Sequence, residues 1–171
     1  VLVAFVSKTF LVHQKTYDVQ GQVTDMVQRA RGSLDLMTRE VRMAGYNPMG
    51  VSFSGISYNA GFIVCFADLN EDGDLGDAEE GIIYYYDSGN KRIHRATYSG
   101  NQILADHIQD FKFSYLKADG SVTTNTAEIR QIRVLITART EQPDADYTAN
   151  GGYRTYSLTS LVTPKNLSLQ G

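Results

Sequence analysis

Residues Val19 to Pro48 read VQGQVTDMVQRARGSLDLMTREVRMAGYNP, and this stretch decides the fold. Its apolar residues recur at steps of three and four, which places them on one face of a helix. They are Val19, Val23, Met26, Val27, Ala30, Leu34, Met37, Val41 and Ala44. Gly45 and Pro48 follow the last of them, as is usual where a helix ends. The sequence therefore predicts a long helix that ends near residue 46 and buries one face.

The same helix is expected to extend towards the N-terminus, because neither proline nor a turn cluster interrupts residues 1–44. Val1–Val6 is apolar, but Ser7–Thr9 is polar, and a membrane span needs roughly 20 apolar residues. We interpret Val1–Val6 as the end of a hydrophobic helix that begins before this sequence. Val27–Ala44 is predicted to be core. Val1–Tyr17, roughly 25 Å of helix, is predicted to lie beyond the sheet and to contact other subunits.

After Pro48 the hydrophobic period changes from 3.6 to 2, which indicates strands. Strands and helices do not alternate along the chain, which argues against a parallel sheet. We therefore predict six to eight antiparallel strands. The expected strands are Val51–Tyr58, Gly61–Ala67, Gly81–Asp87, Arg92–Tyr98, Phe111–Leu116, Glu128–Thr140 and Tyr153–Val162, with Ile103–Ile108 left open between a strand and a helical turn. The fold class is α+β. A helical part, residues 1–46, and a β-sheet domain, residues 47–171, are expected to fold as one unit.

Composition excludes several kinds of site. A single cysteine, Cys65, permits no internal disulfide and no zinc-ligand set, and its apolar surroundings favour a buried residue over a nucleophile. The three histidines lie in separate segments. The chain has no nucleophile or phosphate-loop motif, so we expect no enzyme. The absence of a basic tract argues against nucleic acid as a partner.

The charge is concentrated in one place. The chain has 16 Lys plus Arg and 19 Asp plus Glu, a formal charge of −3. Seven of the acids lie between Asp68 and Glu80, with no basic residue among them. Residues 68–79 read DLNEDGDLGDAE, which matches the calcium-loop pattern D-x-[DN]-x-[DN]-G-x5-E. Calcium prefers six to eight oxygen ligands, so alternate residues of a tight loop must point inward. The sequence therefore predicts a calcium site in this loop.

The pattern assigns a role to each position. Side-chain oxygens would come from Asp68, Asn70 and Asp72, a backbone carbonyl from Asp74, and two carboxylate oxygens from Glu79, with Glu80 as the alternative to Glu79. The flanking segments look like strands rather than helices, so the ion would staple a connection between two strands rather than operate a helical sensor. The competing interpretation is a solvated acidic turn.

The helix end, Gln28 to Tyr46, resembles the signature of PilW-type minor pilins of type IV pili. In that family a run of the form R-x-A-L-D-L-L-x-R-(D/E)-(I/L)-R-M-A-G-Y closes the N-terminal helix. Three further segments are similar to that family as well. They are Phe66–Asn70 with its acidic continuation, the pair Ile82 and Tyr84, and the ending Tyr156–Asn166, which closes with Val162–Asn166. The resemblance implies a type IV pilin-like fold, with a long N-terminal helix packed on an antiparallel sheet.

The resemblance also implies a function. The chain would be a minor pilin that helps to initiate a type IV pilus, contacting other minor pilins and the major pilin through the N-terminal helix. A segment preceding Val1 would anchor it in the inner membrane, facing the periplasm, before assembly places it in the pilus at the cell surface. The alternatives are a GspJ-like pseudopilin of type II secretion and a calcium-dependent adhesion module at a filament tip.

Overall fold

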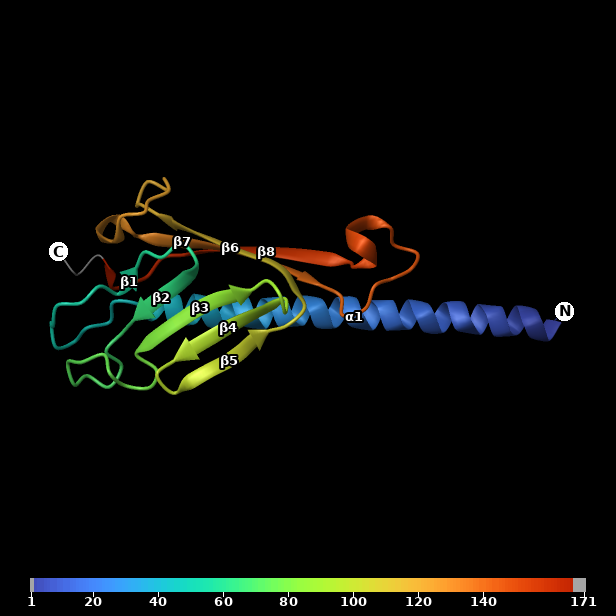
Figure 1. Cartoon of the computed structure of the whole chain (residues 1–171), viewed down its shortest axis with the longest axis horizontal. Coiled ribbons are helices and arrows are strands. Elements are labelled where there is room, and N and C mark those ends of the chain that lie inside the picture. Colours follow the sequence, from blue (N-terminus) through green and yellow to red (C-terminus); the bar gives the residue numbers. More distant parts are fainter. Residues whose placement is uncertain (1, 168–171) are drawn as a thin grey trace.

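The computed structural model describes the backbone of residues 2–167 and the side chains of residue 10 and residues 13–167. One long helix is followed by eight strands (Figure 1). In chain order these elements, with two short 3-10 helices, are α1 (Leu2–Met43), β1 (Ile56–Ser57), β2 (Phe62–Phe66), β3 (Gly81–Asp87), β4 (Arg92–Thr97), β5 (Gly100–Ala105), β6 (Ile108–Leu116), η1 (Thr126–Glu128), β7 (Gln131–Arg139), η2 (Ala149–Gly152) and β8 (Thr155–Val162). The predicted α+β class is confirmed.

Helix α1 ends where its sequence predicts. Gly45 has a φ of +83°, a backbone conformation that glycine adopts without a steric penalty. The chain then passes close to a second glycine, because a Cβ on Gly55 would lie 2.3 Å from the backbone nitrogen of Gly45. The amide of Gly45 donates to the carbonyl of Phe66. The end of the helix is thus fixed to the beginning of the sheet domain by backbone contact.

The apolar stripe of α1 is the centre of the core. Six residues of the stripe are almost fully buried, whereas Val23 and Val27 are partly buried against the same cluster. The buried members are Met26, Ala30, Leu34, Met37, Val41 and Ala44. Cys65 packs in this core at 3% exposure, and burial raises the pKa of its thiol to about 12, as expected of an inert cysteine. The prediction that Val27–Ala44 is core is confirmed.

Two antiparallel sheets pack on α1, where the sequence suggested one. Strands β1 to β5 form a five-stranded sheet in chain order, and β6, β7 and β8 form a three-stranded sheet. Tyr84 of β3 lies opposite Arg95 of β4, and both side chains face the helix. The connection between the two sheets is a tight bend, in which His107 has a φ of +53°.

Several of the predicted strands change in extent, and Val51–Tyr58 changes most. Residues 51–55 are not a strand, because the Asn47 side chain bonds both the amide and the carbonyl of Val51 and holds that segment in a turn. Only Ile56 and Ser57 pair with β2. For Ile103–Ile108 the sequence left open whether the segment is a strand or a helical turn. In the structure this segment contains the end of β5 and the start of β6, on either side of the bend.

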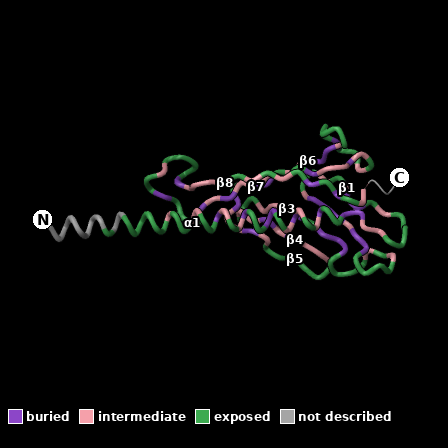
Figure 2. Tube along the Cα trace, turned by 180° about the vertical axis from the view of Figure 1, so that it is seen from behind, coloured by how far each residue is buried: buried purple, intermediate pink, exposed green. Residues whose placement is uncertain are grey.

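The N-terminal part of α1 projects beyond the two sheets (Figure 1), and it is exposed where its side chains are described (Figure 2). The prediction for Val1–Tyr17 was nevertheless wrong in one respect, because the loop at 141–154 reaches back to Lys15. The Lys15 ammonium lies 2.6 Å from the Asp146 carboxylate and 3.5 Å from that of Asp144. The backbone amide of Gln142 also donates to the Gln22 side chain. We call residues 141–154 the clasp loop.

Within residues 2–167, no helix combines the length and the hydropathy that crossing a bilayer requires. The interpretation of Val1–Val6 concerns side chains outside the described residues.

Candidate metal site

The acidic loop, residues 68–80, connects β2 to β3 and is also fastened to the end of α1. The Asp68 amide donates to the Tyr46 carbonyl at 2.9 Å, and the Tyr46 hydroxyl donates to the Glu71 carboxylate at 2.8 Å. At the base of the loop, the Ala67 amide donates to the Glu80 carbonyl at 3.0 Å. The loop therefore joins β2, β3 and the turn that follows α1, rather than only the two strands that the sequence suggested.

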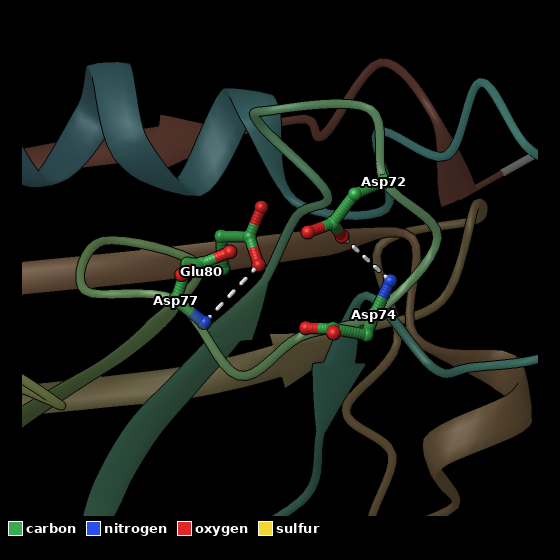
Figure 3. A group of neighbouring side chains, drawn as sticks. All are labelled: Asp72, Asp74, Asp77 and Glu80. Carbon is green, nitrogen blue, oxygen red and sulfur yellow. Dashed lines mark hydrogen bonds between the residues drawn. The ribbon is translucent and has the colours of Figure 1, made fainter.

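Four carboxylates converge inside this loop, and together they could hold a metal ion. One oxygen from each of Asp72, Asp74, Asp77 and Glu80 lies within 4.8 Å of all the others (Figure 3). Glu80 is 2% exposed, whereas the three aspartates are exposed to solvent. Hard divalent cations prefer this oxygen-rich type of site.

Backbone amides hold the carboxylates in position. The Asp74 amide donates to Asp72 at 3.0 Å and the Gly76 amide to Asp74 at 2.7 Å. Glu80 accepts three amides, from Leu69 at 2.8 Å, Asn70 at 3.3 Å and Asp77 at 3.4 Å. These bonds fold the loop around Glu80 and hold its carboxylate within the cluster.

The five residues predicted as ligands lie in different places. Asp72 and Asp74 belong to the cluster. Asp68 is fully buried, its Oδ2 accepts the Gly73 amide at 3.1 Å, and its Oδ1 accepts no hydrogen bond from the described residues. The amide nitrogen of Asn70 donates to Asp72 at 2.9 Å and to Asp77 at 2.6 Å, so a neutral donor stands between two carboxylates.

Glu79 turns away from the loop, and Glu80 enters it. The Glu79 carboxylate lies 2.5 Å from the Arg95 guanidinium on β4. Of the two glutamates that the sequence left open, Glu80 is therefore the one that belongs to the cluster. Asp77 was missed, because the calcium-loop pattern gives no role to that position. Its spacing of three residues from Glu80 was the available signal, since one turn brings both side chains to the same side.

The electrostatics of the loop favour a cation. None of the four clustered carboxylates, nor Asp68, forms an ion pair with a lysine, arginine or histidine of the described residues. Desolvation, and then the charges of Asp72, Glu80 and Asp74, raise the pKa of Asp77. The amide of Asp74 and the side chain of Asn70 instead lower the pKa of Asp72. A buried or crowded carboxylate normally gains a positive partner, which this loop does not supply.

A second charged network connects the loop to the helix. Arg95 donates to both oxygens of Glu40 on α1, with its Nη2 2.9 Å from Oε1, and it also bonds Glu79. The Tyr84 hydroxyl donates to Glu40 as well. Burial, followed by the bond to Glu40, raises the pKa of Tyr84. The side chains of Arg95 and Glu40 are only 10% and 18% exposed, so the pair is largely removed from solvent.

Comparison with known proteins supports the architecture. No protein-family model and no curated protein matches this sequence. Among solved structures, the chain is similar to the type IV-like pilin TTHA1219 from Thermus thermophilus, with a TM-score of 0.55 and 11% identity. The match covers 82% of this chain and 97% of that one. At this identity the likeness concerns the fold alone, and the chain accordingly has a type IV pilin-like fold.

Proposed function

We propose that this chain is a structural subunit of the pilin type, namely a PilW-like minor pilin that helps to initiate a type IV pilus. The observation that carries the proposal is the projecting part of α1, which extends beyond both sheets in a pilin-like fold (Figure 1). Two of its aromatic side chains, Phe10 and Tyr17, are 67% and 72% exposed. A helix that exposes large apolar side chains outside its own core is a surface for other subunits.

The proposal includes the partners and the location. The projecting helix would contact other minor pilins and the major pilin, first at the inner membrane, facing the periplasm, and then in the pilus at the cell surface. The role is structural and not enzymatic. The helical part, residues 1–46, and the sheet domain, residues 47–171, would move through assembly as one unit, because the stripe of α1 supplies much of their common core.

We also propose calcium as the ion of the acidic loop. The donor set consists of hard oxygens, and the fully buried Asp68 presents one carboxylate oxygen that accepts no hydrogen bond from the residues that the structure describes. The ligands would come from Asp68, Asp72, Asp74, Asp77 and Glu80, with Asn70 joining after its amide turns its oxygen inward. A bound ion would neutralise carboxylates that otherwise repel one another and so fix β2 and β3 to the end of α1.

Deletion of the gene tests the pilin role, with surface pili counted by electron microscopy. We expect pili to be lost and to return when the intact gene is supplied. Complementation by a gene in which Phe10 and Tyr17 are both replaced by serine should fail, although the protein folds. Normal piliation in the deletion strain would contradict the proposal. Normal piliation with blocked protein secretion would instead identify a type II secretion pseudopilin.

A further inference from the structure

The two sheets leave open edges on either side of α1. Strand β5 is the last strand of the five-stranded sheet, and β8 is the last strand of the three-stranded sheet. Within residues 2–167, no strand pairs with the outer side of either one. An open edge presents backbone donors and acceptors that can pair with another chain, so proteins usually protect such edges.

The other two sheet edges are protected, and this makes the contrast informative. Strand β1 is only two residues long. Strand β6 carries Asp110 and Lys112, which form an ion pair, and residues after it fold back in a bridge between Leu116 and Val122. Short strands, charges and covering segments are the devices that prevent pairing between molecules.

Strand β8 has none of these devices. Strand β5 has an irregular register with β4 around Leu104, and Leu104 and the following Asp106 contact α1, but Gly100–Ile103 is exposed. Their sequences, GNQILA and TYSLTSLV, contain no charged residue and no proline. Each exposes one large aliphatic side chain, Ile103 at 52% on β5 and Leu161 at 51% on β8. Ile103 lies opposite His94, on the face of its sheet turned away from α1, and Leu161 lies opposite Arg133 on the corresponding face of the other sheet. The two edges are therefore alike in charge and in the side of the sheet that carries the aliphatic residue.

The two edges run in opposite directions along α1. On β8, Ser160 lies by Thr38, and Lys165 beyond it bonds Arg42, so β8 runs in the same direction as the helix. On the other side, Leu104 lies by Ser33. Asp106 lies by Arg29, so β5 runs against the helix (Figure 1). Two molecules with parallel helices would consequently present β5 and β8 to each other in the antiparallel sense, which gives the more stable ladder.

The edge of β5 borders an open groove on its helix side. A groove of about 360 Å³ runs between β5 and α1, lined on the helix by Gln28, Arg29, Gly32 and Ser33. A Cβ on Gly32 would meet nothing within 4 Å, so this part of the groove floor is open. The part of the β5 edge at Gly100–Ile103 is therefore accessible, whereas the end of the strand at Leu104 contacts Ser33 of α1.

We propose that β5 pairs antiparallel with β8 of a second copy of this chain, which extends the sheet from one molecule to the next. Ile103 of one copy would then pack beside Leu161 of the other on the continuous outer face. Because the two edges differ, the contact is heterologous, and it leaves a free β5 at one end and a free β8 at the other. A third copy and further copies can therefore join through the same contact. The inference rests on the proposed function for the parallel arrangement of the helices.

Cysteine cross-linking of the full chain tests this contact. In a Cys65→Ala background, Asn101→Cys is combined in turn with Ser157→Cys, Thr159→Cys and Leu161→Cys, all on the outer faces of the edge strands. After oxidation we expect a ladder of oligomers on a non-reducing gel from at least one combination, because every copy carries both halves of the contact. Each single-cysteine variant should give no ladder. Adding Ile103→Lys should reduce the ladder at least tenfold, and adding Ile103→Val should preserve it.

Several results would overturn the proposal. Dimers from Asn101→Cys alone would mean that β5 pairs with itself. A ladder that survives Ile103→Lys would mean that the edge is not the contact. Absence of any ladder, while Phe10→Cys in the same background does cross-link, would restrict subunit contacts to α1 and leave the pilin proposal intact. Absence of cross-links from Phe10→Cys as well would count against both proposals. Thermal melts that match the parent exclude misfolding of each variant.

Discussion

The acidic loop is bonded to Tyr46 just after α1, and the clasp loop is bonded to Lys15 and Gln22 of α1. The two loops thus lie at opposite ends of the packed region of the helix, and both contain aspartates. Both aspartates of the clasp loop have basic partners, Arg154 within the loop and Lys15 on α1. Asp144 lies 2.9 Å from Arg154 and 3.5 Å from Lys15, and Asp146 lies 2.6 Å from Lys15. The acidic loop has seven acids, and among the described residues only Glu79 has an ion pair, with Arg95.

This difference separates two ways of fixing a loop to a helix. A loop whose acids pair with cations of the protein is held by ion pairs, and where the cation is partly exposed, as Lys15 and Arg154 are, each pair is worth about 1 kcal/mol or less. Its attachment depends little on a ligand from the solvent. A loop that concentrates carboxylates without cations is held only when the solvent supplies one. Attachment by ion pairs is weak but needs no ligand, whereas attachment by a metal ion is strong only when the ion is bound.

The largest effect is expected at Arg95, the cation that the acidic loop shares with the helix. Arg95→Met leaves Glu40 with the Tyr84 hydroxyl alone and frees Glu79. Removing one partner of a buried pair costs 3–5 kcal/mol, and we expect about 3 kcal/mol because Glu40 keeps one hydrogen bond and some contact with water. Urea unfolding would measure the loss in free energy of unfolding.

Arg154→Met is the matched control in the clasp loop. Its guanidinium is 41% exposed, and Asp144 would keep Lys15 and the amide of Asp146 as partners. The expected cost is below about 1 kcal/mol. Equal losses from the two arginines would mean that the charge networks of the two loops do not differ in strength.

Calcium is expected to stabilise the protein through the acidic loop. At a hundredfold excess over the dissociation constant, a ligand of the folded state adds about 2.7 kcal/mol, which corresponds to roughly 5–11 °C in melting temperature for a chain of this size. Glu80→Gln should remove most of the shift, because it changes the one buried carboxylate among the four of the cluster. Melting curves with calcium and with a chelator would measure this.

Glu79→Gln is the control for Glu80→Gln, because it makes the same change on the neighbouring residue. It should preserve the calcium shift while weakening the contact with Arg95. If Glu79→Gln abolished the shift and Glu80→Gln did not, Glu79 would be the ligand, as the sequence pattern proposed. Identical melting curves of the parent with calcium and with chelator would leave the solvated acidic turn as the better interpretation.

The fold could be predicted because its signals are local and periodic. The stripe from Met26 to Ala44 determines which helix face is buried, and a period of two marks most strands. The division into two sheets was not visible, because it depends on the bend at His107, where nothing in the sequence interrupts the alternation strongly. The contact of Lys15 with Asp144 and Asp146 could not be predicted either, since about 130 residues separate the partners.

The candidate site was predicted in part for a similar reason. The spacing of Asp68, Asp72 and Asp74 follows from a tight turn, which short-range sequence determines. The direction of the two glutamates depends on Arg95, which attracts Glu79, and on the amides of Leu69, Asn70 and Asp77, which hold Glu80. Those partners come from a neighbouring strand and from the folded loop, so a pattern based on spacing alone could not choose between adjacent glutamates.

The smallest effect is expected in the clasp loop at low pH. The bond from Arg154 is the main cause that lowers the pKa of Asp144, followed by the amide of Asp146. A carboxyl with a lowered pKa stabilises the folded state above its ordinary value, about 3.9, and loses this contribution only as the pH falls through the lowered value. The clasp should therefore stay closed until the pH is below about 3.9. An NMR titration of the Asp144 carboxyl carbon would show a midpoint below that of an unpaired aspartate, and Arg154→Met should raise it. An unchanged midpoint in that variant would mean that the arginine does not hold the loop, and that Lys15 and the backbone suffice.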